Sequence, residues 1–220
     1  GPRPRVAPAR GARRTLERGK ARRFVPLFLH PVVSPCLRAP VPRSLPPPMN
    51  RSALASRIAE LALLRGEFTL RSGRTSHYYL DKYRFSTDPQ VLRQLGEMFA
   101  GRVPGGVNRL AGAELGGIPL VTAASLASGL PTVFIRNARK DYGTAKQLEG
   151  LLEAGDRLML LEDVCTSGGQ VLEAAADLEA AGGSVELILA TIDREEGARE
   201  QIESAGYAFD ALFTKSDLGV

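Results

Sequence analysis

The sequence predicts an α/β fold in which helices flank a mainly parallel central sheet, with a small N-terminal hood made of one helix and a β-hairpin. Two observations support this prediction. From residue 109 onward, short apolar runs typical of buried strands alternate with segments of helical periodicity. Residues 50–80 instead contain one helical segment followed by two strand-like runs. Because strands that alternate with helices usually pair in parallel, the first pattern indicates the sheet and the second the hood.

The hood helix is predicted to begin at Asn50, a residue type that caps helix N-termini, and to end at Gly66. Its apolar positions recur at helical spacing and are Leu54, Ile58, Leu61 and Leu64. The segment F-T-L-R-S-G-R-T-S-H-Y-Y-L-D follows, and its two β-prone runs around Ser72 and Gly73 predict a hairpin.

A second helix is predicted to begin at Asp88, with Pro89 at its first position, and to end at Gly101. After it, we expect strands over 110–111, 132–135, 158–161 and 185–192, and helices over about 118–128 and 169–181. Residues 49–220 are therefore predicted to form one domain.

The composition excludes several classes of protein. With 220 residues, of which 44% are hydrophobic, the chain can bury one sizeable core. No apolar run approaches the roughly 18 residues of a membrane helix, so we expect no membrane segment. The net charge of +5 is uneven, since the first 48 residues carry +10 and the remainder carries −5. A nucleic-acid partner is therefore not expected for the domain.

The first 48 residues hold eleven of the 15 prolines and ten arginines, and end in three prolines before Met49. This composition predicts a disordered extension that is not part of the fold. Three explanations remain open: sequence upstream of a true start at Met49, a transit peptide, or a basic arm. The first is favoured, because a helix with its own cap begins directly after Met49.

Two cysteines occur, Cys36 and Cys165. This number argues against a disulfide framework and favours a reduced, cytoplasmic setting. Cys165 is predicted to be a small packing residue, because no histidine lies near it in the sequence. His77 has no second histidine with which to bind a metal.

The most informative stretch is M-L-L-E-D-V-C-T-S-G-G-Q-V, residues 159–171. A buried strand leads to the acids Glu162 and Asp163, and a turn of small residues, 166–169, opens a helix. Such a turn lets a phosphate approach free backbone N–H groups at the positive end of the helix dipole. Carboxylates beside a phosphate would repel it, so the acids are expected to face sugar hydroxyls or a magnesium ion. A sugar phosphate fits both halves.

Three further segments have chemistry that suits such a ligand. Residues 136–150 form a charged, glycine-bearing segment after a strand, which predicts a mobile loop whose cations, such as Arg139 and Lys146, can cover a polyanion. A second turn of small residues lies in A-G-A-E-L-G-G-I-P-L, residues 111–120. Arg194 follows a strand and can bind a carboxylate through two N–H donors.

The acid pair and its turn resemble the signature of the type I phosphoribosyltransferases, and no Walker or dinucleotide-binding pattern is present. Taken together with F-T-L-R-S-G-R-T-S-H-Y-Y-L-D, A-E-L-G-G-I-P-L, R-N-A-R-K-D-Y-G-T and I-D-R, they are similar in content and order to the orotate phosphoribosyltransferase family over residues 50–220. The resemblance implies the type I phosphoribosyltransferase fold.

The resemblance also implies an activity, that of a pentosyltransferase. Ribose 5-phosphate would pass from phosphoribosyl pyrophosphate to N1 of orotate, giving orotidine 5′-monophosphate and pyrophosphate in UMP biosynthesis. Mg²⁺ would bridge substrate oxygens, with no protein ligand assigned to it. A homodimer is implied, in which the mobile loop of one subunit reaches the site of the other.

The resemblance assigns roles to individual residues. The catalytic residues would be Lys140, Glu162 and Asp163. The phosphoribosyl pyrophosphate site would comprise Arg136, Asn137, Lys140, Tyr142, Glu162, Asp163, Val164, Cys165, Thr166, Ser167, Gly168, Gly169 and Gln170. The orotate site would comprise Arg71, Tyr79, Leu80, Thr166 and Arg194.

The chain departs from the family's usual pattern at three positions. Asn137 stands where a lysine is usual, Tyr142 where histidine is common, and Gly116 where some members have lysine. These changes remove cations and are expected to weaken phosphoribosyl pyrophosphate binding, unless Arg139 and Lys146 compensate.

Two other hypotheses remain. A phosphoribosyltransferase for another base would keep residues 162–169 but would not need Arg71 and Arg194. A non-catalytic regulator that senses phosphoribosyl pyrophosphate would bind nucleic acid through its basic extension in a salt-sensitive manner.

Overall fold

The computed structural model describes residues 46–69, 75–137 and 147–220, which lie in one compact unit. Three predicted features lie outside these residues: most of the extension, which was predicted to be disordered, the turn of the hairpin, and most of the charged loop. The residues that precede the first helix, 46–50, are attached to the fold at Met49, whose N–H donates to Gln94 Oε1 at 3.0 Å. Gln94 Nε2 donates in return to the Met49 carbonyl at 2.6 Å.

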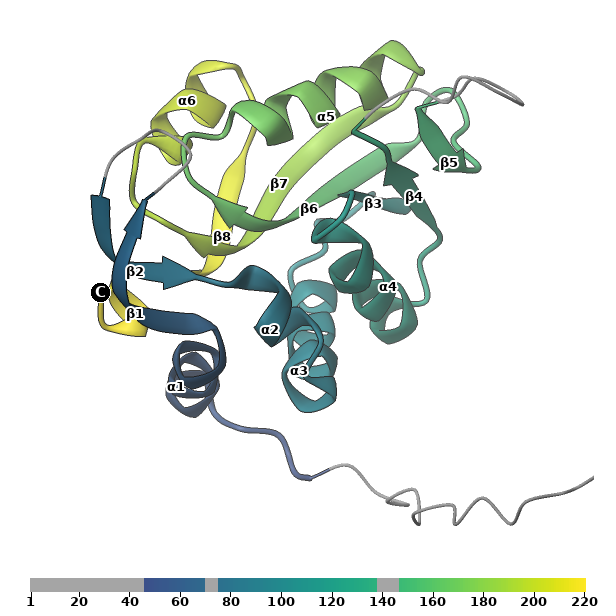
Figure 1. Cartoon of the computed structure of the whole chain (residues 1–220). Helices are drawn as coiled ribbons and strands as arrows, with labels where there is room; N and C mark the ends of the chain where they lie inside the picture. The colour runs from purple at the N-terminus through teal and green to yellow at the C-terminus, as the bar shows by residue number, and fades with distance from the viewer. Residues whose placement is uncertain (1–45, 70–74, 138–146) are drawn as a thin grey trace, which may run out of the picture. The chain divides into compact units, whose positions relative to one another are not determined.

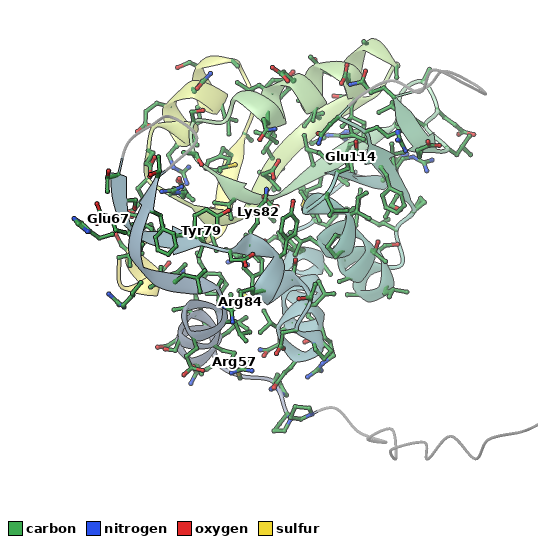
Figure 2. All side chains as sticks on the ribbon, viewed as in Figure 1. Arg57, Glu67, Tyr79, Lys82, Arg84 and Glu114 are labelled. Carbon is green, nitrogen blue, oxygen red and sulfur yellow. The ribbon has the colours of Figure 1, made fainter. Side chains whose placement is uncertain are left out.

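The hood consists of α1 (Arg51–Ala62) and the antiparallel strands β1 (Leu63–Thr69) and β2 (Thr75–Leu80). Asn50 caps α1 as predicted, since its side-chain oxygen accepts from the Ala53 N–H at 2.8 Å. The prediction that the helix continues to Gly66 is wrong. Leu63 and Leu64 pair with Leu80 and Tyr79, so strand pairing takes the residues that helical spacing had assigned to a last turn. Glu67 and Tyr79 mark the two strands in Figure 2.

The central sheet has the order β5-β4-β3-β6-β7-β8, and β5 alone is antiparallel to its neighbour. The strands are β3 (Arg109–Ala113), β4 (Thr132–Ile135), β5 (Leu148–Gly150), β6 (Arg157–Cys165), β7 (Ser184–Asp193) and β8 (Phe209–Thr214). The predicted parallel sheet is thus confirmed. Two strands were not predicted: β5 lies within the segment predicted as a loop, and β8 follows the last predicted strand.

Helices cover both faces of this sheet (Figure 1). On one face lie α5 (Gly169–Ala180) and α6 (Ala198–Ser204), and on the other α3 (Pro89–Ala100) and α4 (Gly117–Ser128), with α1 nearby. The short α2 (Lys82–Ser86) joins the hood to α3, and a 3₁₀ turn, η1 (Ser216–Leu218), ends the chain. None of the helices in the described ranges has the length and apolar composition needed to cross a membrane.

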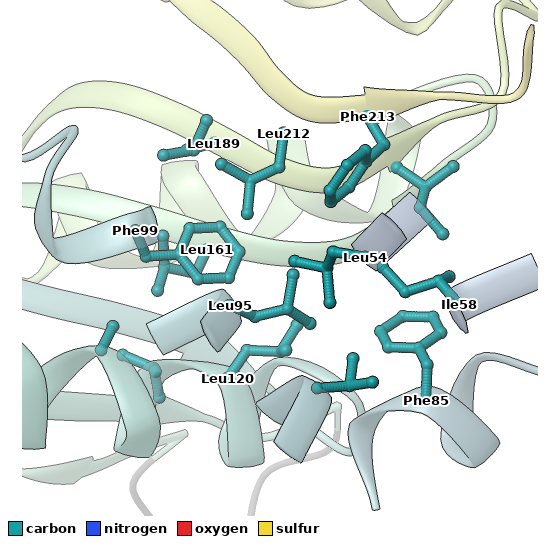
Figure 3. Packing of buried hydrophobic residues seen from close by; sticks show 14 of the residues in the cluster. Leu54, Ile58, Phe85, Leu95, Phe99, Leu120, Leu161, Leu189, Leu212 and Phe213 are labelled. Atoms are coloured by element: carbon teal, nitrogen blue, oxygen red, sulfur yellow. The ribbon is translucent and has the colours of Figure 1, made fainter. Parts of the chain in front are cut away.

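The strand residues alternate between two hydrophobic cores, as the two-residue period of a strand requires. Leu161 and Leu189 point to the core shared with Leu54, Leu95 and Phe99 (Figure 3). Their neighbours Leu160 and Ile188 point to the core beneath α5 and α6. Because β6 and β7 are buried on both faces, they have the continuous apolar sequences that predicted them.

The order of the strands fixes where a ligand can bind. The chain passes from β3 to β4 on one side, and β6 pairs with β3 on the other side. The switch point between β3 and β6 leaves a crevice at the carboxyl ends of these strands, where open α/β sheets bind their ligands.

Candidate active site at the switch point of the sheet

Two turns flank the switch point, residues 114–116 after β3 and residues 166–168 after β6. A cavity of about 210 Å³ lies beside the first of these turns. It is lined by polar side chains from α2, from the turn after β3, from both ends of the charged loop, from β6 and from α5, including Lys82, Glu114, Arg136, Asn137, Gln147, Glu162, Asp163, Gln170, Glu173 and Asp177. Glu162 and Gln170 also line a second cavity at the turn after β6, so the two small-residue turns lie at adjacent cavities that share these two residues.

Glu162 and Asp163 lie within β6, three and two residues before its last residue, Cys165. The Asp163 side chain is only 1% exposed, and its Oδ1 accepts from the Val164 N–H at 2.6 Å. Glu162 Oε1 accepts from the Asp163 N–H at 3.0 Å. Backbone donors therefore orient both carboxylates beside the cavity.

Lys82 is the main charged partner of Asp163. Its Nζ lies 2.9 Å from Oδ2 as an ion pair and donates to Oδ1 at 3.1 Å. Burial has the largest single effect and lowers the pKa of Lys82, but the charge and hydrogen bond of Asp163 together with the charges of Glu162 and Tyr83 outweigh burial and leave this pKa raised. Lys82 was not among the predicted site residues, and its only signal in the sequence is a lysine directly after the hairpin, in L-D-K-Y.

The pKa of Glu162 is held well above its ordinary range. Burial is the largest cause, and the adjacent Asp163 adds to it, because two neighbouring carboxylates resist ionising together. Lys82 acts in the opposite direction and lowers this pKa. The ammonium group thus offsets part of the negative charge that would repel a phosphorylated ligand.

The turn after β6 surrounds a separate small cavity of about 70 Å³, lined by Glu162, Val164, Cys165, Thr166, Ser167, Gly168, Gly169, Gln170 and Val171. Gly168 has φ +87°, a conformation that favours glycine, and α5 begins directly after it. Thr166 and Ser167 are exposed, so their hydroxyls are available to a ligand. The turn offers these donors at a helix N-terminus.

Cys165 is buried in the core beneath α5 and α6, as predicted for a packing residue. Burial, assisted by the nearby carboxylates, raises the pKa of its thiol. A nucleophilic thiolate is therefore disfavoured at this position.

The start of the charged loop also reaches the cavity. Arg136 Nη1 lies 3.8 Å from Glu149 Oε1, and the Asn137 N–H donates to Glu114 Oε1 at 2.6 Å. Gln147, at the other end of the loop, donates to Asp177 Oδ2 at 2.6 Å. Arg139, Lys140, Tyr142 and Lys146 lie outside the described residues.

Arg194, directly after β7, faces the hood rather than the acid pair. Its Nη2 lies 2.9 Å from Glu196 Oε1 and 3.5 Å from the Tyr78 hydroxyl, and its guanidinium lies 5.8 Å from the Tyr78 ring centroid. Arg194 Nε is buried and has no hydrogen-bond partner in the described part of the chain. Tyr78 was not among the predicted site residues.

Tyr79 lies on the opposite side of β2 from Tyr78, because side chains alternate along a strand. It is 47% exposed, and its ring packs 5.7 Å from that of Phe68. Leu80 is half-buried beside it, whereas Arg71 lies outside the described ranges. Among the described residues of the hood, Tyr78 is the one with a recorded contact to Arg194.

An acid pair and a phosphate-sized turn at the switch point of a helix-flanked parallel sheet define a type I phosphoribosyltransferase. The solved structure of orotate phosphoribosyltransferase from Mycobacterium tuberculosis in complex with 5-phospho-α-D-ribosyl 1-diphosphate agrees with this class. It matches with a TM-score of 0.65 and 28% identity over 77% of this chain and 99% of that one. No protein-family model matches the chain.

The curated relatives identify the family. The orotate phosphoribosyltransferase of Natronomonas pharaonis is 44% identical over 70% of this chain and 87% of its own length. That of Methanosarcina acetivorans is 45% identical over 71% and 84%, respectively. The chain belongs to the orotate phosphoribosyltransferase family.

Proposed function

We propose that this protein is an orotate phosphoribosyltransferase of UMP biosynthesis. It transfers ribose 5-phosphate from phosphoribosyl pyrophosphate to N1 of orotate and releases pyrophosphate. The observation that carries this proposal is the position of the acid pair beside two adjacent cavities, one at each small-residue turn, in a chain of this family. A relative solved with phosphoribosyl pyrophosphate supports the same donor substrate.

The residues of the crevice suit the parts of this donor. Residues 166–169 bind the 5-phosphate through hydroxyl and backbone donors. Glu162 and Asp163 accept hydrogen bonds from the ribose hydroxyls as the sugar gains oxocarbenium character. Arg136 and Asn137, with Lys140 and Tyr142 from the loop, contact the pyrophosphate. Charge stabilisation of the leaving group then carries the reaction, because orotate is already anionic.

Magnesium fits this crevice as a companion of the substrate. Its lining contains the hard carboxylate oxygens that magnesium and its bound waters prefer. Among the described residues, no three histidine, cysteine or acidic side chains are grouped as a metal site, so we propose that substrate oxygens hold the ion. When bound, it would neutralise the leaving pyrophosphate.

Arg194 and Tyr78 are proposed to recognise orotate. A buried guanidinium nitrogen that has no hydrogen-bond partner among the described residues, beside an aromatic ring, suits a planar carboxylate-bearing base. Arg71 and Thr166, and the backbone of Tyr79 and Leu80, are proposed to complete this site.

We also propose a cytoplasmic location and a folded domain that begins near Met49.

The test is a panel of bases. Full-length protein with phosphoribosyl pyrophosphate and Mg²⁺ is expected to consume orotate, followed by absorbance, but not uracil, adenine, guanine or xanthine. Arg194→Met should reduce kcat/KM for orotate by about 100-fold, as expected when charged hydrogen bonds are lost. Arg57→Met is the matched control, because it removes the charge of a partly exposed arginine of α1 that pairs with Glu60 and Asp88.

Each alternative gives a different result. Turnover of another base, insensitive to Arg194→Met, would favour a phosphoribosyltransferase of different specificity. Folded protein that turns over no base and binds nucleic acid in a salt-sensitive manner would favour the regulator.

A homodimer is also proposed, formed through an apolar groove on α3 and α4. The groove is lined by Pro89, Leu92, Arg93, Glu97, Ala123, Leu126 and Ala127, and Leu126 is 85% exposed. An exposed apolar side chain in an apolar groove is typical of a protein interface. A second copy would bury the groove and allow the charged loop to act across the interface.

Leu126→Glu is expected to convert the dimer to a monomer in sedimentation experiments and to lower kcat, since it places a charge in an apolar interface. Leu151→Glu is the matched control, because Leu151 is 62% exposed but does not line the groove. If Leu151→Glu separates the subunits and Leu126→Glu does not, the proposed interface is wrong.

A further inference from the structure

Lys82 lies where the hood meets the acid pair. It is the first residue of α2, directly after the hairpin, and its ammonium group reaches Asp163, which is 81 residues away in the chain. In Figure 2, Lys82 lies between α2 and the central sheet, whereas Arg84 lies on the other side of α2. The Lys82 side chain is 36% exposed and lines the cavity together with Gly116 and Arg136.

The charge of this cavity makes Lys82 important. Its described lining includes the carboxylates of Glu114, Glu162, Asp163, Glu173 and Asp177, and the cations Lys82 and Arg136. Arg136 Nη1 lies 3.8 Å from Glu149 Oε1. A polyanionic group that enters the cavity therefore meets the ammonium of Lys82 as the positive charge closest to Asp163.

The geometry leaves this ammonium able to bind a ligand. An ammonium group has three N–H donors, and one of them is directed at Asp163 Oδ1. Asp163 keeps the hydrogen bond from the Val164 N–H, so its orientation does not depend on Lys82 alone. The remaining donors can point at a ligand oxygen without loss of the ion pair.

The facing turn cannot supply a cation at this point. A Cβ atom added to Gly116 would overlap Asp163 Oδ2, so position 116 has no room for a side chain while Asp163 lies as it does. Lys82 instead brings a positive charge to the same carboxylate.

We propose that Lys82 binds the pyrophosphate group of phosphoribosyl pyrophosphate, and that Asp163 holds the ammonium at the cavity before the substrate arrives. The inference rests on the proposed function. Because one residue, Asp81, separates β2 from α2, the contact would also couple the strand that carries Tyr78 to the leaving group. Pyrophosphate binding and orotate binding would then be linked through the five residues from Tyr78 to Lys82.

The test compares two ligands by calorimetry on the full-length protein. Magnesium pyrophosphate contains the group that Lys82 is proposed to bind, whereas orotidine 5′-monophosphate contains the ribose phosphate and base without it. Lys82→Met should weaken magnesium pyrophosphate binding by about tenfold or more, the effect of losing one charged hydrogen bond. Orotidine 5′-monophosphate should bind with little change, and Lys82→Arg should restore part of the pyrophosphate affinity.

Arg84→Met removes a charge from the same helix at an exposed position outside the cavity and should change neither affinity. If Lys82→Met weakens the binding of both ligands equally, Lys82 acts only by positioning Asp163, and the proposal is overturned. Unchanged affinity for both ligands would overturn it as well. Orotate turnover by the wild type tests the proposed function separately. A wild type that turns over no orotate but shows the pyrophosphate-selective loss would retain Lys82 as a pyrophosphate ligand, and a wild type that binds no pyrophosphate would overturn both.

Discussion

Replacing Asp156 with alanine is expected to lower the free energy of unfolding by about 3–5 kcal/mol, because a buried guanidinium then loses its counter-ion. Asp156 directly precedes β6 and is 5% exposed. Its Oδ2 accepts from Arg109 Nε at 2.6 Å and from the Glu153 N–H at 2.8 Å, and its Oδ1 accepts from Asn108 Nδ2 at 2.9 Å. One carboxylate thus fixes the amino ends of two central strands.

The contribution of Asp156 to the free energy of unfolding depends on pH, because the pKa of its carboxyl group is shifted in the folded state. Burial has the largest single effect and would raise this pKa, but the hydrogen bonds from the Glu153 N–H, Arg109 and Asn108, together with the charge of Arg109, outweigh it and lower the pKa below its ordinary value. A carboxyl group whose pKa is lower in the folded state stabilises the fold above its unfolded pKa. This contribution is therefore present at neutral pH and is lost as the pH falls below about 4.

Chemical denaturation of Asp156→Ala measures the predicted loss, and Asp210→Ala is the matched control. Asp210 is 53% exposed and lies 3.7 Å from Arg102, a surface pair whose removal should cost about 0.5 kcal/mol or less. The folded fraction of Asp156→Ala should keep its kcat, because Asp156 lies at the amino end of β6 and the crevice lies at the carboxyl ends of the strands. A loss no larger than that of Asp210→Ala would show that Arg109 finds another partner.

The parts of the site that could be predicted are contiguous in the sequence. Glu162, Asp163 and residues 166–169 follow one buried strand, so strand, acids and turn can be recognised without the fold. The carboxyl ends of parallel strands share one edge, which also brought the second turn and Arg194 towards the site. Their ligands remain predictions.

The parts that could not be predicted depend on contacts between distant residues. Lys82 meets Asp163 across 81 positions, and Arg194 meets Tyr78 across 116. Neither contact follows from periodicity, because it depends on how the hood packs over the sheet. The five-residue α2 and three-residue β5 are too short to show a period. At the end of α1, Leu63 and Leu64 suit both helix and strand, and pairing with β2 decides between them.

Replacing Gly116 with alanine is expected to reduce kcat/KM by about 100-fold, the scale of effect that follows when a reacting group is displaced by about 1 Å. The backbone at Gly116 has φ −71° and ψ −29°, which alanine adopts without strain. The effect is therefore steric. The added methyl group would overlap Asp163 Oδ2, so the carboxylate must turn away from Lys82 and from the ribose hydroxyls that it is proposed to bind.

Steady-state kinetics with phosphoribosyl pyrophosphate limiting measure this loss, and Gly105→Ala is the matched control. A Cβ atom added to Gly105 meets nothing within 4 Å, so that variant should retain wild-type kinetics. Thermal unfolding of Gly116→Ala should remain cooperative, since the overlap involves one side chain at the rim of a cavity. Near wild-type kinetics would mean that Asp163 functions from a second position. In that case, the reaction does not require a glycine at position 116. The lysine that some family members have there would then be compatible with this site.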